Sequence, residues 1–382
     1  MRDLDALIAE IRAVYGEGPV PLHRPVFAGA ERRFLVECVD STFVSSVGPM
    51  VGEFEARVAA FTGARFAVAT VNGTAALQVA LQLAGVEPEQ EVITQPLTFV
   101  ATCNAVRYGG AWPVFVDVDR DTLGLSPTAL RAFLERHAAR RDDGSYNRTT
   151  GRRLAACLPV HSFGHPCRIA EIAAICAEYS IPVVEDAAES LGSWAGARHT
   201  GTFGRLGVLS FNGNKIITTG GGGMILTDDE ALARRAKHLT TTAKVPHAWE
   251  FVHDEVGYNH RMPNLNAALG CAQIERLPEM LAAKRVVAER YASFGVRHGL
   301  ELVRERAGTT ANYWLNAVVL GSRAQRDAFL EASNAAGVMT RPVWRLMHRL
   351  EMFQDCQHDG LANAEWLEER VVNLPSSVPC PL

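Results

Sequence analysis

Short apolar runs alternate with longer amphipathic stretches between about residues 65 and 240. A short apolar run is typical of a buried strand, whereas a longer stretch with apolar residues every three or four positions is typical of a helix. Parallel strands need a helical crossover between them, so this alternation predicts repeated strand–helix units and a mostly parallel sheet. The predicted fold is therefore of the α/β class.

The pattern also gives element and domain boundaries. Strands are expected at 66–71, 91–94, 113–116, 154–160, 182–185, 207–211 and 224–226, and helices at 74–84, 98–108, 127–138 and 170–179. Beyond about residue 250 a long helical stretch begins, followed by a strand signal at 313–320 and a helix signal at 326–335. We expect an N-terminal helix and a large domain over 1–250, and a smaller domain over 251–382. The polar segment 140–153 lacks periodicity and is predicted as a solvated loop or, alternatively, as a partner contact.

Charge and composition exclude several functional classes. The formal net charge is -4, with Lys+Arg 38 against Asp+Glu 42, so there is no basic field for nucleic acid or anionic lipid. No apolar run approaches the roughly 20 residues that cross a bilayer, and the N-terminus lacks the pattern of a signal peptide. The cysteines form no CxxC pair and no zinc-like spacing with histidine. We expect a cytoplasmic protein with reduced thiols and without a metal, nucleic-acid or membrane partner.

Segment 183–224 carries most of the chemical information. A predicted strand ends in the acid pair Glu185 and Asp186, and another ends at Ser210, five residues before Lys215. Ligands of open α/β folds bind beyond the carboxyl ends of the strands, so Asp186 is expected to face a site. A lysine acts as a nucleophile when its surroundings favour the neutral amine or when a carbonyl partner captures it as an imine. On its own, Lys215 is more often a surface cation.

Pyridoxal phosphate would use both of these groups. Its aldehyde forms a Schiff base with a lysine, and an acid keeps its pyridine nitrogen protonated so that the ring accepts electrons. The turn NGT at 72–74 offers a seat for its phosphate, because a helix N-terminus presents unpaired amides and glycine permits close approach. Ser210 adds a hydroxyl. In isolation NGT is more often an ordinary capped turn, and no P-loop or dinucleotide fingerprint is present. The glycine run 220–223 is interpreted as close backbone packing beside Lys215.

Ordered motifs along nearly the whole chain resemble the DegT/DnrJ/EryC1/StrS family of sugar-nucleotide aminotransferases. They are PLHRPVFAG at 21–29, NGTAAL, QPLTFVATCNAV, VHSFGHP, VEDAAESLGS, SFNGNKIITTGGGGM, GYNHRMPNLNAALG, TRPVW and NLPSS. The resemblance implies the fold type I aspartate-aminotransferase-like architecture, in which a mostly parallel seven-stranded sheet forms the large domain and the smaller C-terminal domain is α+β. Within the family, EDAAES and SFNGNKIITTGGGGM are most similar to the 4-aminotransferases of the bacillosamine and legionaminic-acid pathways.

The resemblance also implies a set of cofactor-binding residues. They are Gly73, Thr74, Phe99, Asp186, Ala188, Glu189, Ser210, Lys215 and Asn259. Lys215 would be the catalytic residue that forms the Schiff base, and Asp186 would hold the ring nitrogen. Phe99 would stack on one face of the ring and Ala188 would pack on the other, although simple core packing fits these residue types equally well. Asn259 would reach the phosphate from the second subunit of a homodimer.

Glu189 departs from the pattern of many relatives. Many relatives have Gln or His where this chain has Glu189, which would face the phenolic oxygen of the cofactor. A carboxylate there repels the oxygen anion unless one of the two groups carries a proton, so Glu189 is interpreted as a subgroup marker. The implied substrate residues are His161, Arg341 and Trp344; purely structural roles fit the last two equally well. The pair His161 and His165 is too weak a pattern to indicate a metal.

The predicted reaction transfers an amino group from L-glutamate to the C4 keto group of a UDP-linked 4-keto-6-deoxy-N-acetylhexosamine. The products are a UDP-4-amino sugar and 2-oxoglutarate, and the pyridoxamine phosphate form of the cofactor carries the amino group between the two half-reactions. One alternative is another nucleotide keto sugar, GDP- or dTDP-linked, aminated at C4 or C3. A dehydratase of this family would replace the lysine with histidine, which Lys215 argues against. A non-catalytic regulatory protein that binds pyridoxal phosphate is the alternative from a different class.

Overall fold

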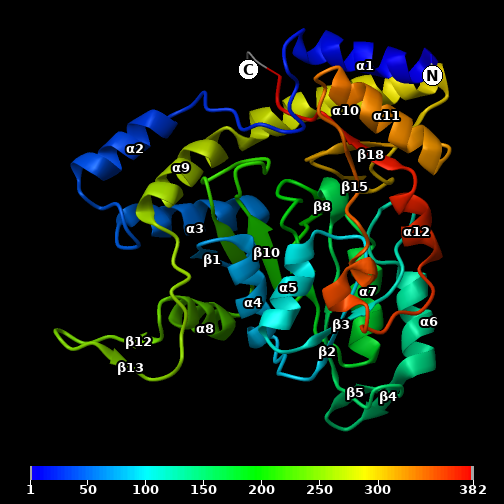
Figure 1. The fold of residues 1–382 in the computed structure, drawn as a ribbon. Helices are drawn as coiled ribbons and strands as arrows, with labels where there is room; N and C mark the ends of the chain where they lie inside the picture. The colour runs from blue at the N-terminus through cyan, green and yellow to red at the C-terminus, as the bar shows by residue number, and fades with distance from the viewer. Residues whose placement is uncertain (1, 380–382) are drawn as a thin grey trace.

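A seven-stranded sheet forms the centre of the structure, a computed structural model that describes residues 2–379 (Figure 1). Its strands are β1 (Phe66–Thr70), β2 (Glu91–Thr94), β3 (Trp112–Phe115), β6 (Leu154–Leu158), β7 (Val184–Asp186), β10 (Leu206–Ser210) and β11 (Gly223–Thr227). Ladders of hydrogen bonds join them in two groups, β1-β11-β10-β7 and β3-β2-β6. Parallel bridges from Cys157 to Val183 and from Val160 to Asp186 connect the two groups, so they form one sheet.

The sheet is mostly parallel. Strand β11 runs antiparallel to both of its neighbours, β1 and β10, whereas β10 pairs in parallel with β7, and β2 pairs in parallel with β3 and β6. Each predicted strand of the 65–240 region overlaps one of these strands. The prediction of an α/β fold with a mostly parallel seven-stranded sheet is confirmed.

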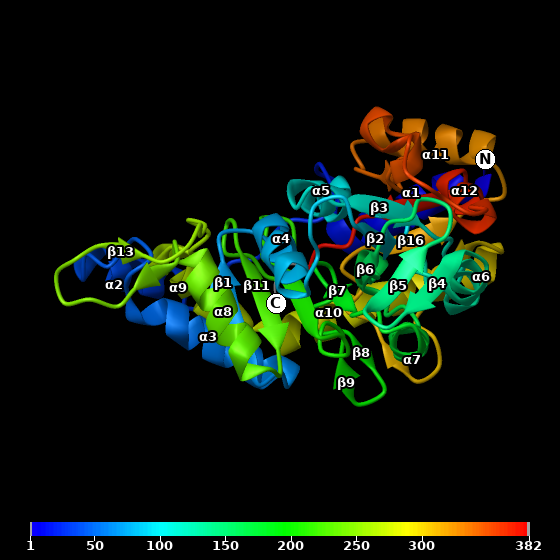
Figure 2. The ribbon, with the colours of Figure 1, turned by 90° about the horizontal axis from the view of Figure 1, so that it is seen from below.

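Helices cover both faces of this sheet (Figure 2). They are α3 (Pro49–Thr62), α4 (Gly73–Leu83), α5 (Val100–Tyr108), α6 (Pro127–His137), α7 (Ile169–Glu178), α8 (Glu230–Thr240) and α9 (Asn264–Glu275). Val68 and Val208 pack toward α4, α5 and α8, while the next residue of each strand, Ala69 and Leu209, packs toward α3 and α9. Successive side chains of a strand point to opposite faces, so a sheet covered on both sides has strands that are apolar throughout.

Polar caps fix where helices begin beside the sheet. The Asn72 side chain accepts the N–H of Ala75 at 2.8 Å, so α4 begins directly after β1. The Asp229 side chain accepts the N–H of Ala231 at 2.8 Å and starts α8 in the same way after β11. An N-cap side chain satisfies one of the amides that have no partner inside the helix. The first amides of α4 therefore lie at the carboxyl end of β1.

The C-terminal part contains a second, antiparallel sheet. Its elements are α10 (Leu277–His298), β14 (Glu301–Leu302), β16 (Asn316–Val319), α11 (Arg323–Ala335), β17 (Arg341–Pro342), α12 (Ala362–Glu368) and β18 (Val371–Leu374). The N-terminal helix α1 (Arg2–Tyr15) packs here, with Leu7 and Ile11 against Val287 and Phe329 (Figure 1). Conversely, α9 packs on α3. Elements from both sides of the boundary predicted at 250/251 pack together, and that boundary stays a prediction.

Segment 140–153 differs from its predicted form. It contains most of a hairpin, β4 (Ala138–Arg141) and β5 (Gly144–Asn147), rather than an irregular loop. The hairpin is held by side-chain contacts, which leave no periodic pattern in the sequence. The Arg141 guanidinium lies 4.0 Å from the Tyr146 ring centre across the strands, and Asn147 donates to the buried Glu91 carboxylate at 2.7 Å. A cross-strand pair such as Arg141 with Tyr146 stabilises a hairpin that has no alternating apolar pattern. The Asn147 bond ties the hairpin to β2.

Short elements complete the described chain. They are α2 (Glu31–Asp40), the strands β8 (Trp194–Ala195), β9 (Arg198–His199), β12 (Lys244–Val245), β13 (Val252–His253) and β15 (Thr309–Thr310), and the 3-10 helices Ser162–Gly164, Met347–Arg349 and Glu351–Phe353. The β12–β13 hairpin projects from one end of the molecule in both views (Figures 1 and 2). Cys38, Cys103, Cys157, Cys167, Cys176, Cys271 and Cys356 are free and buried, and Cys380 lies outside the described residues. No helix within residues 2–379 is both long and apolar enough to cross a membrane.

The glycine run 220–223 was predicted to serve close backbone packing beside Lys215, and the structure shows close backbone packing at Gly223, against the turn that contains Asn72. Strand β11 begins at Gly223, which lies against the turn between β1 and α4. A Cβ atom on Gly223 would lie 2.5 Å from the backbone carbon and oxygen of Asn72, closer than atoms pack. At Gly221 the nearest atom to such a Cβ is 3.9 Å away. Of these two positions, only 223 therefore requires glycine for steric reasons.

Gly223→Ala is expected to lower the free energy of unfolding by about 1–3 kcal/mol, because the methyl group overpacks the turn. Gly221→Ala is the matched control and is expected to stay within about 0.5 kcal/mol of the wild type. Urea unfolding followed by circular dichroism measures both. A Gly223→Ala variant as stable as Gly221→Ala would contradict the packing described for the turn.

Candidate active site

A cavity of about 360 Å³ lies where β7, β10 and the N-termini of α4 and α5 converge. The predicted site residues that line it are Gly73, Thr74, Phe99, Asp186, Ala188, Glu189, Ser210, Lys215 and Trp344. The carboxyl ends of parallel strands meet at one edge of the sheet, and the segments that follow them shape this cavity. Residues far apart in sequence thus share one pocket.

Asp186 ends β7 and presents a buried carboxylate to the cavity. It is 4% exposed. Thr102 of α5 donates its hydroxyl hydrogen to one carboxylate oxygen at 2.7 Å, and the Ala188 N–H donates to the other at 3.2 Å. Thr98 lies just before the N-cap of α5, and its hydroxyl oxygen is 2.7 Å from that of Thr102. Burial raises the pKa of the Asp186 carboxyl. The group is oriented by its neighbours and lacks a cationic hydrogen-bond partner among the described residues.

The N-terminus of α4 forms an anion seat on another side of the cavity. The N–H groups of Gly73 and Thr74 belong to the first turn of the helix, so they have no acceptor within it. A Cβ on Gly73 would lie 3.0 Å from the Ser210 Cβ, so glycine keeps the helix start close to the Ser210 hydroxyl. Together they supply amides, a hydroxyl and the positive end of a helix dipole, which suits a phosphate.

Lys215 lies between an acid and an aromatic ring. Its Nζ is 3.5 Å from the Glu189 carboxylate and 4.0 Å from the centre of the Trp314 ring. Glu189 also accepts the N–H of Phe163 at 2.8 Å. Burial raises the pKa of Glu189, against the opposing charge of Lys215. Phe163 has φ 56°, an unusual angle for this residue type, and this turn aims its N–H at the carboxylate.

Lys215 differs from the other lysines of the chain, which are Lys237, Lys244 and Lys284. Lys237 pairs with Glu55 at 2.6 Å, and Lys244 lies over the exposed Phe251 ring. Lys284 is 1% exposed and donates to the backbone oxygens of Trp314 and Ser376. Lys215 alone among these four lysines lines the cavity that holds Asp186.

Aromatic side chains form the wall of the cavity. Phe99 precedes α5 and is 53% exposed, with its ring centre 6.5 Å from that of Trp344. Trp344 packs on Phe163 at 4.7 Å, and Phe163 is fully buried. Phe99 is the exposed member of this group, so its ring face is available to a planar ligand.

Three predicted residues do not line this cavity. His161 is fully buried; its Nδ1 accepts the Cys167 N–H at 3.2 Å, so its Nε2 carries the hydrogen that is donated to Glu185 at 3.0 Å. Arg341 is exposed and donates to Asn334 at 2.9 Å and to the Thr340 backbone oxygen at 2.8 Å. Asn259 is also exposed, and its side-chain oxygen accepts from Arg261 at 2.9 Å. The roles expected for these three residues stay predictions.

The sequence reasoning missed Thr102 and Trp314. The spacing of Thr98 and Thr102, four residues apart on a predicted helix, places both hydroxyls on one helix face and was the available signal. Trp314 lies in the segment ANYWLN, where only its residue type distinguished it. Its distance from Lys215 in the chain gave no indication of contact.

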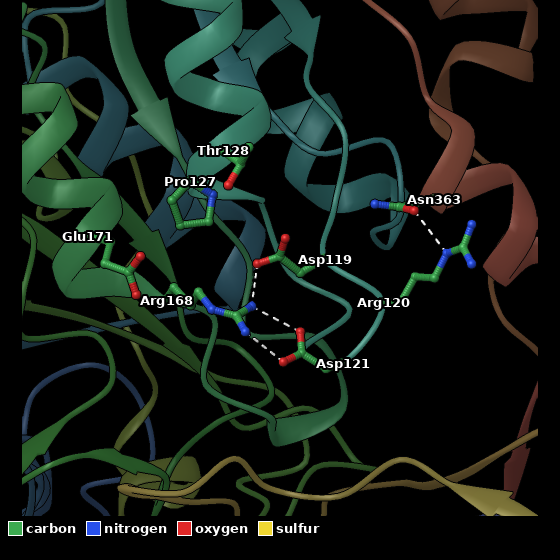
Figure 3. Close-up of a pocket in the computed structure, with 8 residues that line it drawn as sticks. All are labelled: Asp119, Arg120, Asp121, Pro127, Thr128, Arg168, Glu171 and Asn363. Carbon is green, nitrogen blue, oxygen red and sulfur yellow. Dashed lines mark hydrogen bonds and ion pairs between the residues drawn. The ribbon is translucent and has the colours of Figure 1, made fainter.

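A second hollow, of about 590 Å³, lies at the N-termini of α6 and α7 (Figure 3). Although larger, it holds no lysine or aromatic ring. Arg168 donates to both Asp121 carboxylate oxygens at 2.9 and 2.7 Å, and it also bonds Asp119. The Arg168 guanidinium is thus already occupied by two carboxylates of the hollow.

One cluster of metal-ligand type occurs within residues 2–379, outside the cavity. His238, Asp254 and Glu255 bring their ligand atoms within 4.8 Å of one another. His238 pairs with Asp254 at 2.7 Å, and the Arg235 guanidinium already contacts both Glu255 oxygens. The cluster is an ion-pair network that holds the segment after β13 on α8.

The donor set of the cavity fits pyridoxal phosphate. A buried carboxylate suits a protonated ring nitrogen, the start of α4 with Ser210 suits the phosphate, and Lys215 suits the aldehyde. Glycine at position 73 leaves open the space beside Ser210 that a side chain would occupy. This chemistry agrees with the comparisons to known proteins.

The model of the DegT/DnrJ/EryC1/StrS aminotransferase family matches residues 28–379. The GDP-perosamine synthase of Caulobacter vibrioides is 36% identical over 356 residues, which cover 92% of this chain and 91% of that protein. EpsN of Bacillus subtilis, which carries the name of a pyridoxal phosphate-dependent aminotransferase, is 36% identical over 360 residues, 93% of this chain and 90% of that protein. The crystal structure of the aminotransferase TlmJ from Streptoalloteichus hindustanus superposes with a TM-score of 0.84 at 30% identity and covers 94% of each chain. The chain belongs to the DegT/DnrJ/EryC1/StrS family and is a pyridoxal phosphate-dependent aminotransferase.

Proposed function

We propose that this enzyme transfers an amino group from L-glutamate to the C4 keto group of a UDP-linked 4-keto-6-deoxy-N-acetylhexosamine. The observation that supports the amino transfer most directly is the presence of Lys215 and Asp186 in one cavity beside the start of α4. The motifs EDAAES and SFNGNKIITTGGGGM favour the UDP-linked substrate. A GDP-linked 4-keto sugar is the second candidate, because a relative of 36% identity is named GDP-perosamine synthase.

The chain's residues divide the chemistry between them in this proposal. When bound, the cofactor supplies a carbonyl that accepts an amino group and a ring that withdraws electrons from the reacting carbon. Asp186 keeps a proton on the ring nitrogen, and its buried bond from Thr102 orients it for that task. Lys215 removes and returns a proton at the reacting carbon with its Nζ. Gly73 and Ser210 anchor the phosphate, so the ring cannot rotate away from Lys215.

The remaining cavity residues restrict the ring and its substituents. Phe99 covers one face of the cofactor ring. Ala188, whose N–H donates to Asp186, packs on the other face. Glu189 faces the phenolic oxygen of the cofactor in this proposal. Burial raises the pKa of Glu189, and a proton on either of the two groups removes the repulsion that two anions would produce. Trp344 extends the aromatic wall toward the opening, where a nucleotide base or sugar packs.

We also propose that the enzyme is a homodimer in which Asn259 completes the site of the neighbouring subunit. Trp249, Phe251 and Val256 precede Asn259 and are 80%, 81% and 86% exposed. Large apolar side chains gathered on one projecting segment are typical of a protein contact. The projection of the β12–β13 hairpin away from its own subunit is consistent with a reach across an interface (Figure 1).

The dimer proposal predicts complementation between an inactive variant and a weakened one. Lys215→Ala removes the catalytic amine, and Asn259→Ala weakens the neighbouring site. Subunits that are denatured and refolded together form mixed dimers, each with one intact site, so about a quarter of wild-type activity is expected to return under random pairing. Each variant refolded alone is the control. Mixed dimers with no more activity than the separate variants would contradict a shared site.

A panel of nucleotide keto sugars tests the proposed substrate. Glutamate is supplied with UDP-, GDP- and dTDP-linked 4-keto and 3-keto sugars, and the products are identified by mass spectrometry and NMR. We expect C4 amination of the UDP-linked N-acetyl sugar, with a kcat/KM at least about tenfold above the GDP-linked sugar. Lys215→Ala is expected to lower turnover at least about 1,000-fold. Preference for a GDP-linked sugar would support the second candidate, and amination of none of these sugars would overturn the proposed substrate class.

A further inference from the structure

We propose that Trp314 is a positioning residue whose indole face holds the Lys215 ammonium group whenever that lysine is not bonded to the cofactor. This inference rests on the proposed catalytic role of Lys215. It adds a function for a residue that lines the cavity from the C-terminal part of the chain.

The contact between the two side chains is close and shielded. Lys215 Nζ lies 4.0 Å from the centre of the Trp314 ring. The Lys215 side chain is 13% exposed and Trp314 is 5% exposed. A cation over the face of an aromatic ring is attracted by the ring quadrupole, and the attraction grows when water is excluded. The second partner of the amine is Glu189, at 3.5 Å.

Three further bonds fix the orientation of the Trp314 ring. Its indole N–H donates at 2.6 Å to the backbone oxygen of Asn214, the residue directly before Lys215. Its backbone N–H donates to the Asn312 side chain at 2.7 Å. Its backbone oxygen accepts from the buried Lys284 ammonium at 3.2 Å. The ring is therefore tied both to the lysine segment and to the C-terminal part of the chain.

The contacts with Trp314 and Glu189 restrict the free Lys215 side chain during turnover. Lys215 leaves the cofactor in the first half-reaction and bonds it again only at the end of the second, and in between its long side chain has many rotamers. An aromatic face on one side and a carboxylate on the other confine the amine near the position from which it moves protons. Proton transfer depends steeply on such positioning.

The face of Trp314 also favours the charged form of the amine. The other ionisable groups that face it are Glu189, Asp186 and His23. Both acids favour the ammonium, whereas burial and the nearby lysines lower the pKa of His23 and keep it neutral. Loss of the ring removes one stabilising contact from the ammonium without removing an acid.

Trp314→Leu removes the aromatic face, and Trp314→Phe keeps a face but removes the indole N–H. Trp314→Leu is expected to lower kcat about tenfold while the KM for glutamate stays within about threefold. Trp314→Phe is expected to recover most of that loss. Phe329→Leu, at a fully buried ring in the layer beneath α1, is the control for loss of aromatic volume.

A second readout is independent of turnover. In the full-length protein stripped of cofactor, a limiting amine-reactive reagent labels lysines at one fixed pH, and mass spectrometry measures the labelling rate of each lysine. Exposed Lys244 serves as the internal reference. In Trp314→Leu the labelling rate of Lys215 relative to Lys244 is expected to rise about threefold, because the ring no longer holds the amine, and in Phe329→Leu it is expected to stay unchanged. Trp314→Phe keeps a ring face and is expected to stay near the wild-type rate, whereas a merely structural role would not distinguish these two Trp314 variants.

The outcomes separate this inference from the function on which it depends. If Lys215→Ala retains wild-type turnover, the proposed function fails. If Lys215→Ala is inactive while Trp314→Leu keeps wild-type kcat, or while Lys215 in Trp314→Leu is labelled at the wild-type rate, the role of Trp314 is overturned. Equal damage in Trp314→Phe and Trp314→Leu would also overturn it, because the aromatic face would then have no effect of its own.

Discussion

The site depends on the placement of one buried carboxylate, Asp186, at the end of β7. A carboxyl group at this depth is costly unless hydrogen bonds hold it, and Thr102 and Ala188 supply them. The parallel pairing of β7 with β10 then places Ser210, at the end of the neighbouring strand, beside the same cavity. The sheet register therefore sets the distance between the Asp186 carboxylate and the Ser210 hydroxyl.

A second constraint is the close approach of three backbone segments. Gly73 and Gly223 let the start of α4, the end of β10 and the start of β11 pack without intervening side chains. Any side chain there would push the helix amides away from Ser210. The segment between β10 and β11 carries Lys215, and Trp314 bonds to that segment from the C-terminal part. The catalytic lysine of the proposal is thus fixed from both parts of the chain.

Much of this arrangement could be predicted from the sequence. The strands at 66–71 and 207–211 were found because both of their faces are buried and their residues are apolar. Asp186 and Lys215 were found because strand ends mark ligand sites and because pyridoxal phosphate needs both residue types. Hairpin β4–β5 was missed, since its stability comes from contacts such as Arg141 on Tyr146 rather than from an apolar alternation. Trp314 was missed because its contact with Lys215 joins segments about a hundred residues apart, which no local pattern reports.

Long-range packing also separates the predicted site residues. Motif resemblance grouped His161 with the substrate residues, but both of its ring nitrogens are engaged by Glu185 and Cys167 within the protein. The neighbouring residue of the same motif that does reach the site is Phe163, through its backbone N–H. A motif therefore locates a segment, whereas the backbone angles of that segment decide which of its groups faces the cavity.

The central claim is that Lys215 is the residue that bonds the cofactor. Reduction of the loaded enzyme with borohydride makes that bond permanent, and peptide mapping by mass spectrometry identifies the modified lysine. The added mass is expected on the peptide that contains Lys215 and on no peptide that contains Lys237, Lys244 or Lys284. Added mass on one of those three lysines, or on none of the four, would contradict it.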